Sequence, residues 1–148
     1  MTHRKLLAKL GVILGMVCLL VPFTGGTAIA QTAYYSVLSL PWSANMNVCI
    51  GGEICGKSDT VTVDLPPSSY ISTVKVYAHD NVGSNHGAHL NLYLDGVKKG
   101  ELDVKSSGTT LVFPLYTVGS RIVFLSTQAD GSSAGDETVL QHIDVLNS

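Results

Sequence analysis

The chain has 148 residues, of which 45% are hydrophobic and only 14% are charged, and its formal net charge is −2. Soluble domains usually carry about a quarter charged residues, so either membrane insertion or a hydrophobic targeting segment must explain this composition. The apolar residues are concentrated in one run, Leu10 to Phe23, and no comparable run follows. This distribution excludes a multi-span membrane protein, and the length leaves room for one domain.

The N-terminal segment 1–30 has the three parts of a secretory signal peptide in order. Basic residues precede the apolar run, and the segment ends in Ala28-Ile29-Ala30, an A-x-A cleavage signature. We predict cleavage after Ala30, which leaves a secreted or periplasmic domain, 31–148, that does not insert into a membrane. A membrane anchor is the weaker alternative, because the apolar run is shorter than the ~20 residues of a spanning helix.

Cleavage also changes the charge of the protein. It removes three of the nine basic residues and none of the eleven acidic ones, so the net charge becomes −5. We expect no binding to nucleic acid, because phosphate recognition requires clustered Lys and Arg.

Two cysteines remain after cleavage, Cys49 and Cys55, separated by a short segment that contains two glycines. In an oxidising compartment such a pair persists as a disulfide, and we predict that it closes this loop. A metal or redox pair is the alternative, but the spacing is not C-x-x-C.

The mature sequence alternates apolar and polar residues in short runs bounded by Gly, Pro, Asn, Asp and Ser, and helical periodicity is absent. This pattern predicts an all-β protein, a single antiparallel β-sandwich or jelly roll of about eight strands. Pro66-Pro67 is expected to end a strand, Asp95-Gly96 to form a tight hairpin turn, and 43–59 to be the least regular segment. The expected strands are 34–40, 60–65, 72–79, 89–95, 98–104, 109–115, 121–127 and 138–146.

The strands 72–79 and 89–95 each have one apolar face and one polar face. We predict that they pair antiparallel with His79 opposite His89, because a shift of one residue would mix the two faces. The polar face of the pair would then carry Lys75, Tyr77, His79, His89, Asn91 and Tyr93.

Five of these side chains are the predicted ligand-binding residues: Tyr77, His79, His89, Asn91 and Tyr93. Aromatic rings stack on sugar rings, and imidazoles and amides hydrogen-bond to hydroxyl groups, so this face predicts glycan binding. The alternative is an ordinary solvated sheet face, on which Tyr is common.

Two loops contain oxygen ligands suited to calcium. The predicted calcium residues are Asp80, Asn81, Asn85, Asp136 and Glu137. Neither loop matches the twelve-residue calcium motif, and the same residue types form ordinary turns. Zinc bound by His79, His86 and His89 is a weaker alternative.

Signals for catalysis are weak. The H-E-x-x-H motif does not occur, and no spacing singles out a Ser-His-Asp triad. We therefore expect no enzymatic activity. Trp42, the single tryptophan, is expected to cover the core, with a ligand platform as the alternative.

The segments 71–81, 89–104, 109–115, 119–128 and 139–146 resemble the galactose-binding-like β-sandwich superfamily, which includes many carbohydrate-binding modules. The resemblance implies a jelly-roll fold. Ligand residues vary between families of this superfamily, so none can be transferred to this sequence, and its common calcium site has no secure counterpart here.

Together these features predict a secreted or periplasmic, non-catalytic domain that binds a glycan or another cell-envelope component. A structural or stress-related envelope protein without a small-molecule ligand is the alternative, and a hydrolase is a third and weaker one.

Overall fold

The computed structural model describes residues 29–30, 32–52, 55, 59–81, 88–128 and 137–148. Within these ranges the regular structure is entirely β, and no helix there is long and apolar enough to cross a membrane. The strands are β1 (Ile29–Ala30), β2 (Ala33–Ser36), β3 (Trp42–Ile50), β4 (Val61–Asp80), β5 (Ala88–Leu94), β6 (Val97–Val104), β7 (Thr109–Gln128) and β8 (Thr138–Leu146).

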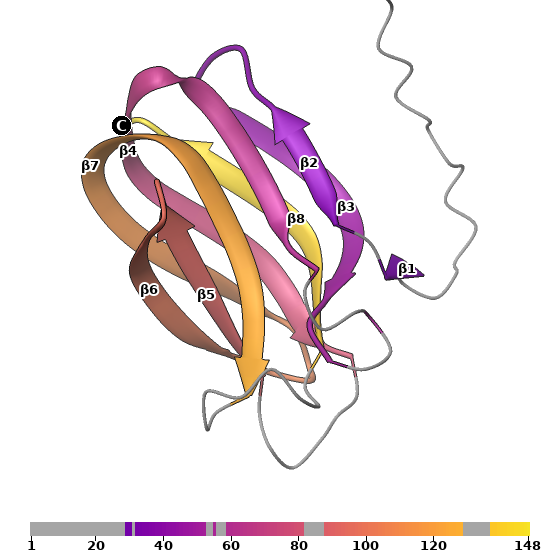
Figure 1. The fold of residues 1–148 in the computed structure, drawn as a ribbon. Helices are drawn as coiled ribbons and strands as arrows, with labels where there is room; N and C mark the ends of the chain where they lie inside the picture. The colour runs from indigo at the N-terminus through magenta and orange to yellow at the C-terminus, as the bar shows by residue number, and fades with distance from the viewer. Residues whose placement is uncertain (1–28, 31, 53–54, 56–58, 82–87, 129–136) are drawn as a thin grey trace, which may run out of the picture.

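Two layers of strands face each other, as the prediction of a β-sandwich required (Figure 1). The front sheet has the order β2-β4-β7-β5-β6 and the back sheet the order β1-β3-β8-β4-β7. Strands β4 and β7 appear in both sheets because each is 20 residues long and bends from one layer into the other. The first half of each strand pairs with the second half of the other, so the two sheets form one continuous hydrogen-bonded ladder.

The core lies between the layers and is built from alternate residues of each strand. Val74 and Val76 of β4 are fully buried in the back sheet, and Leu90 and Leu92 of β5 are fully buried in the front sheet. Phe113 and Phe124 of β7 meet at a ring-centroid distance of 6.5 Å. The period-two pattern of the sequence therefore identified the buried side of both strands.

The predicted partnership between 72–79 and 89–95 is wrong. Strand β4 pairs with β7 and β8, whereas β5 pairs with β6 and β7. The two apolar faces confront each other across the core instead of lying side by side. An alternating pattern satisfies both arrangements equally, because it states which side of a strand is buried and not which strand lies next to it.

The expectation that 43–59 is irregular is wrong for its first part, which β3 occupies up to Ile50. Strand β3 pairs antiparallel with β8, with an irregularity in the register between Asn45 and Val48. Trp42, Ala44, Met46 and Val48 alternate with polar residues, but the three intervening Ser and Asn side chains made the run look like a loop.

Strand β4 continues through Pro66-Pro67, where the sequence predicted a strand end. The pairing with β7 nevertheless breaks between Asp64 and Ser69, because proline cannot donate a ladder hydrogen bond. The prolines thus interrupt the ladder at the bend between the two sheets without ending the strand.

Three local predictions are confirmed. Asp95 and Gly96 both have positive φ angles, 50° and 81°, in a two-residue turn between β5 and β6. Cys49 and Cys55 form a disulfide and are both buried. Trp42 packs against the core and lies 5.6 Å from the ring of Tyr35.

Candidate functional site

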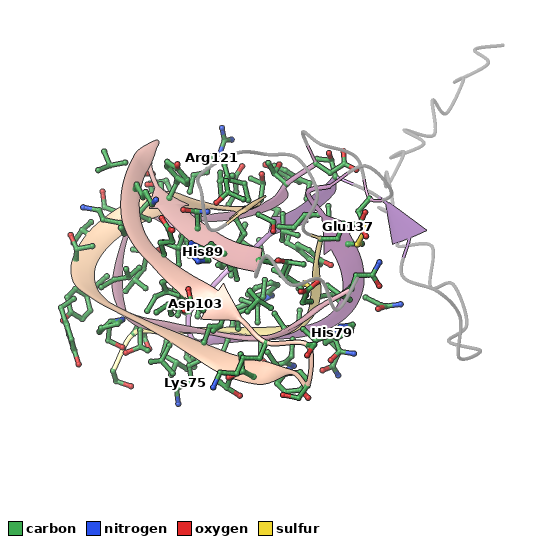
Figure 2. All side chains as sticks on the ribbon, turned by 90° about the horizontal axis from the view of Figure 1, so that it is seen from below. Lys75, His79, His89, Asp103, Arg121 and Glu137 are labelled. Carbon is green, nitrogen blue, oxygen red and sulfur yellow. A yellow bond between two sulfur atoms is a disulfide. The ribbon has the colours of Figure 1, made fainter. Side chains whose placement is uncertain are left out.

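The five predicted ligand-binding residues lie on two opposite surfaces of the sandwich. Tyr77 and His79 belong to the outer face of the back sheet, and His89, Asn91 and Tyr93 belong to β5 in the front sheet. Figure 2 shows Lys75 and His79 on one side of the molecule and Arg121 of the front sheet on the other. The predicted composite surface is therefore split, because the strands that carry it are not neighbours.

On the back sheet, Tyr77 lies in a row of side chains from three adjacent strands. The register places Tyr77 of β4 opposite His142 of β8, and His142 opposite Asn45 of β3. His142 Nδ1 is 2.6 Å from Asn45 Oδ1. Because paired residues in an antiparallel ladder share a face, these three side chains form one continuous row.

A second row runs parallel to the first. Lys75 of β4 is opposite Asp144 of β8, which is opposite Ser43 of β3. A hydrogen bond from Ser43, with smaller contributions from His142 and Lys75, holds the pKa of Asp144 below its ordinary value despite partial burial. Asp144 is therefore a carboxylate at neutral pH and can accept hydrogen bonds.

Ser43, His142 and Asp144 include the residue types of a hydrolytic triad but not its geometry. Ser43 Oγ lies 3.1 Å and Asp144 Oδ1 2.9 Å from the same nitrogen, Nε2 of His142. A triad requires the acid on one imidazole nitrogen and the nucleophile on the other. Here Asn45 occupies the second nitrogen, so the arrangement orients the imidazole without activating the serine.

The aromatic part of this surface is Tyr77, whose side chain is 41% exposed. Its ring lies over Gly108, where an added Cβ would come within 2.7 Å of the Tyr77 hydroxyl. Val112, also exposed, is opposite Lys75 on the same face. We call the surface formed by Tyr77, Val112, Lys75, His142, Asn45, Ser43 and Asp144 the back-sheet face.

Two of the three front-sheet members of the predicted site, His89 and Asn91, are engaged with their own neighbours. His89 Nε2 is 2.8 Å from Asp103 Oδ1, and its Nδ1 contacts Glu101. Asn91 is only 1% exposed and donates to Thr127 Oγ1 at 2.9 Å. His89 is thus held between two carboxylates, and Asn91 is not available to a ligand.

The predicted calcium residues gather in part at one end of the back sheet. Asn81 Nδ2 donates to Glu137 Oε2 at 2.9 Å, and the Asn81 backbone N–H donates to the Glu137 carbonyl at 2.8 Å. Asp80 pairs in register with Thr138 beside them. Asn85 and Asp136 lie outside the described residues. Asn81 and Glu137, one from each of the two predicted calcium segments, therefore lie side by side, as a shared site would require.

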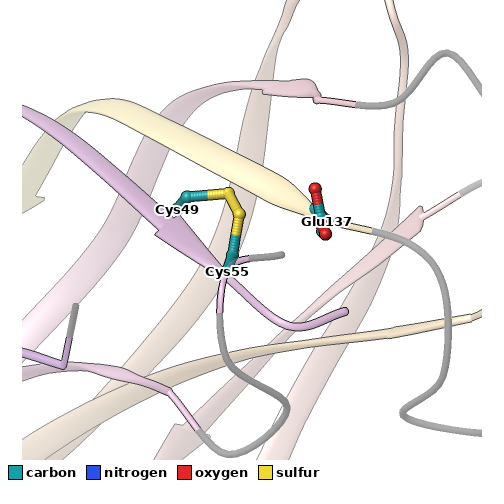
Figure 3. Close-up of side chains that lie close together, drawn as sticks. All are labelled: Cys49, Cys55 and Glu137. Carbon is teal, nitrogen blue, oxygen red and sulfur yellow. A yellow bond between two sulfur atoms is a disulfide. The ribbon is translucent and has the colours of Figure 1, made fainter. Parts of the chain in front are cut away.

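Glu137 also lies next to the disulfide (Figure 3), and it is 1% exposed. One carboxylate oxygen and the sulfurs of Cys49 and Cys55 lie within 4.8 Å of one another. The two sulfurs are bonded to each other, so neither is a thiolate that would ligate a metal. The zinc alternative is not supported either, because His79 and His89 lie on different sheets and His86 is outside the described residues.

The sequence prediction missed His142, Asn45, Ser43 and Asp144. Their signal was the polar alternation in β3 and β8, which resembles that of any solvated strand. Only the pairing of β3, β8 and β4 brings these residues next to Tyr77.

No protein-family model matches the chain, and no curated protein matches it. Among solved structures, the CBM36-1 domain of a multidomain xylanase from the hindgut metagenome of Trinervitermes trinervoides is similar. It aligns over 72% of this chain and 86% of that chain, with a TM-score of 0.51 and 16% sequence identity.

Two further carbohydrate-binding modules have lower TM-scores. A CBM36 module in complex with calcium and xylotriose aligns over 70% of this chain and 87% of its own, with a TM-score of 0.45 and 16% identity. A variant of the CBM29-2 module aligns over 74% and 80%, with a TM-score of 0.47 and 13% identity. The alignment with the CBM36-1 domain shows that the chain has the β-sandwich fold of that module.

Proposed function

We propose that this protein is a non-catalytic domain that binds a glycan through the back-sheet face. The observation that carries the proposal is the row Tyr77, His142 and Asn45, in which an exposed ring lies beside oriented hydrogen-bonding groups on one sheet surface. The fold shared with the xylanase module supports the same function class.

The chemistry of the face fits a sugar polymer. The Tyr77 ring offers an apolar surface for the C–H face of a pyranose. Lys75 can donate hydrogen bonds to sugar hydroxyl groups, and the carboxylate of Asp144 can accept hydrogen bonds from them. The hydrogen bonds of His142 with Asn45 and Asp144 reduce the side-chain entropy lost on binding. Because these residues come from adjacent strands of a sheet face, the surface suits an extended chain of several sugars.

Charge favours a neutral polymer. Lys75 lies next to Asp144 on the adjacent strand, so the face has no unopposed basic cluster for an acidic glycan. Xylan is the first polymer to test, because the similar module belongs to a xylanase.

The test is affinity gel electrophoresis of the purified protein in gels containing soluble xylan, with other neutral polysaccharides in parallel. Tyr77→Ala should lower the affinity for the polysaccharide, measured from the retardation, about tenfold or more. Truncation of an aromatic side chain that the ligand covers commonly costs about 2 kcal/mol or more of binding free energy. Tyr70→Ala is the matched control, because Tyr70 is similarly exposed, at 48%, but lies at the bend of β4.

Equal retardation of Tyr77→Ala and the wild type would refute the proposal that the back-sheet face binds the glycan. Absence of retardation by every neutral polysaccharide, together with recovery of envelope proteins in cross-linked complexes, would favour the structural envelope protein instead.

Export to the periplasm or the exterior belongs to the same proposal. It is supported by the signal sequence and by the buried disulfide, which persists in an oxidising compartment. Mass spectrometry of the exported protein should find Gln31 as its first residue. An uncleaved N-terminus would contradict the proposed processing and would imply that segment 1–30 is retained.

We propose that calcium binds at the end of the back sheet where Asn81 and Glu137 lie. Glu137 and Asn81 supply oxygen atoms of the hard type that calcium prefers, and hydrogen bonds hold the two residues side by side. When bound, the ion would link the end of β4 to the start of β8 and would not take part in a reaction.

A further inference from the structure

We infer that the front sheet carries a second ligand site, a pocket for a single neutral sugar residue at the end of the sandwich opposite the disulfide. The pocket has a volume of about 590 Å³ and is open to solvent. It is bounded by Asp64 and Leu65 of β4, by the turn Asp95-Gly96, and by Ser120 and Arg121 of β7. This site is independent of the back-sheet face, which lies on the opposite side of the molecule.

The polar wall of the pocket is held in place by a three-residue network. Arg121 donates to Asp64 through two parallel hydrogen bonds, from Nε to Oδ1 at 2.6 Å and from Nη2 to Oδ2 at 2.9 Å. The hydroxyl of Tyr34 donates to the same carboxylate. A bidentate guanidinium and carboxylate pair has a defined planar geometry, so the polar atoms of this wall are preorganised.

The floor near the turn is equally well defined. Asp95 Oδ1 accepts the backbone N–H of Arg121 at 2.8 Å and that of Ser120 at 3.1 Å. The backbone N–H of Asp95 donates in return to the carbonyl of Arg121 at 2.8 Å. These bonds fasten the β5–β6 turn to the bend of β7, so the pocket is a rigid feature of the fold.

Space for a ligand lies above the turn. A Cβ added to Gly96 would meet no heavy atom within 4 Å, so the backbone here is exposed to the open volume. The apolar part of the pocket lining is formed by Leu65 and Val123. Apolar side chains next to paired donors and acceptors are the combination that a small polar ligand such as a sugar requires.

The charge of the pocket selects the class of sugar. Asp64 and Asp95 outnumber Arg121, and the guanidinium is already paired with Asp64. An acidic sugar or a phosphate would meet net negative charge, whereas the remaining N–H groups of Arg121 and the Asp64 oxygens suit neutral hydroxyl groups. The pocket has room for a single sugar ring, so the terminal residue of a chain is the expected ligand.

The site is tested by titrating the ¹⁵N-labelled protein with D-xylose, D-glucose, D-galactose, D-mannose and L-arabinose and following amide chemical shifts. At least one sugar should give saturable shifts at Gly96, Ser120 and Arg121. Gly96→Asn should weaken this binding at least tenfold, because asparagine tolerates positive φ and its side chain fills the open volume. Arg121→Lys, which removes the planar fork, is the second variant and should also weaken it at least tenfold.

Tyr70→Ala is again the matched control and should leave the shifts unchanged. Absence of saturable shifts at these amides with every sugar up to 50 mM would overturn the site, as would unchanged binding by both variants. Stronger shifts with glucuronate or inorganic phosphate would overturn the choice of a neutral ligand. Loss of xylan retardation in Tyr77→Ala reports the back-sheet face separately, so failure of one site is distinguishable from failure of the other.

Discussion

Tyr77 of β4 and His142 of β8 are directly opposed residues of an antiparallel ladder, although they are far apart in the sequence. His142 is in turn fixed by Asn45 on one nitrogen and by Asp144 on the other. The ring and the hydrogen-bonding groups of the back-sheet face are therefore held by the backbone ladder and by one another, and not by a loop.

The first prediction concerns His142. His142→Ala should weaken polysaccharide binding roughly fivefold, because it removes the group that orients Asn45 and Asp144, and one hydrogen bond of theirs to the ligand contributes about 1 kcal/mol. His142→Gln keeps a polar group at this position and should recover part of the affinity. Affinity gel electrophoresis measures both variants, and thermal unfolding shows whether they remain folded. Full affinity in His142→Ala would show that the imidazole does not orient the groups that bind the ligand.

The second prediction concerns the disulfide. Replacement of both Cys49 and Cys55 by Ala should lower the free energy of unfolding by about 2 kcal/mol, because the unfolded chain regains the entropy of a short loop. Urea denaturation measures the change. The wild type unfolded in the presence of a reductant is the control and should be destabilised by a similar amount. An unchanged midpoint in both experiments would mean that the buried cluster with Val139 stabilises the loop without the bond.

The third prediction concerns acid. The hydrogen bonds from Arg121, and then from Tyr34, lower the pKa of Asp64 from 3.8 to about 2. A lowered pKa in the folded state stabilises the protein above the ordinary pKa of the carboxyl, and this contribution is lost as the pH falls from about 4 to about 2. Wild type should melt at a higher temperature than Asp64→Asn at pH 6, and the difference should disappear near pH 2.

Melting curves of the two proteins between pH 2 and pH 7 provide the measurement. A difference in melting temperature that is the same at every pH would show that the substitution acts through packing and not through ionisation.

The fourth prediction concerns calcium. If the ion binds the folded protein, a concentration 100 times its Kd should stabilise the protein by about 2.7 kcal/mol, and a chelator should reverse the effect. Glu137→Gln should abolish the shift caused by calcium. The melting temperature is measured with calcium chloride and with EGTA, and magnesium serves as the control cation. Identical melting temperatures in calcium and in EGTA would argue against a structural ion.

Features that depend on neighbours in the sequence could be predicted from the sequence alone. The buried side of β4 and β5 follows from alternation, the hairpin turn from Asp95-Gly96, and the disulfide from two cysteines in a short loop. Each depends on backbone geometry over a few residues, and tertiary contacts did not override it here.

Features that depend on which strands are neighbours required the tertiary structure. The alternation of 72–79 and 89–95 is compatible both with pairing in one sheet and with packing across a core, and the protein adopts the second arrangement. The bends of β4 and β7 decide this, because each passes from one sheet to the other. The sequence by itself therefore determined that Tyr77 faces outward, while the long-range pairing of β4 with β8 determined that His142, and not Asn91, lies beside it.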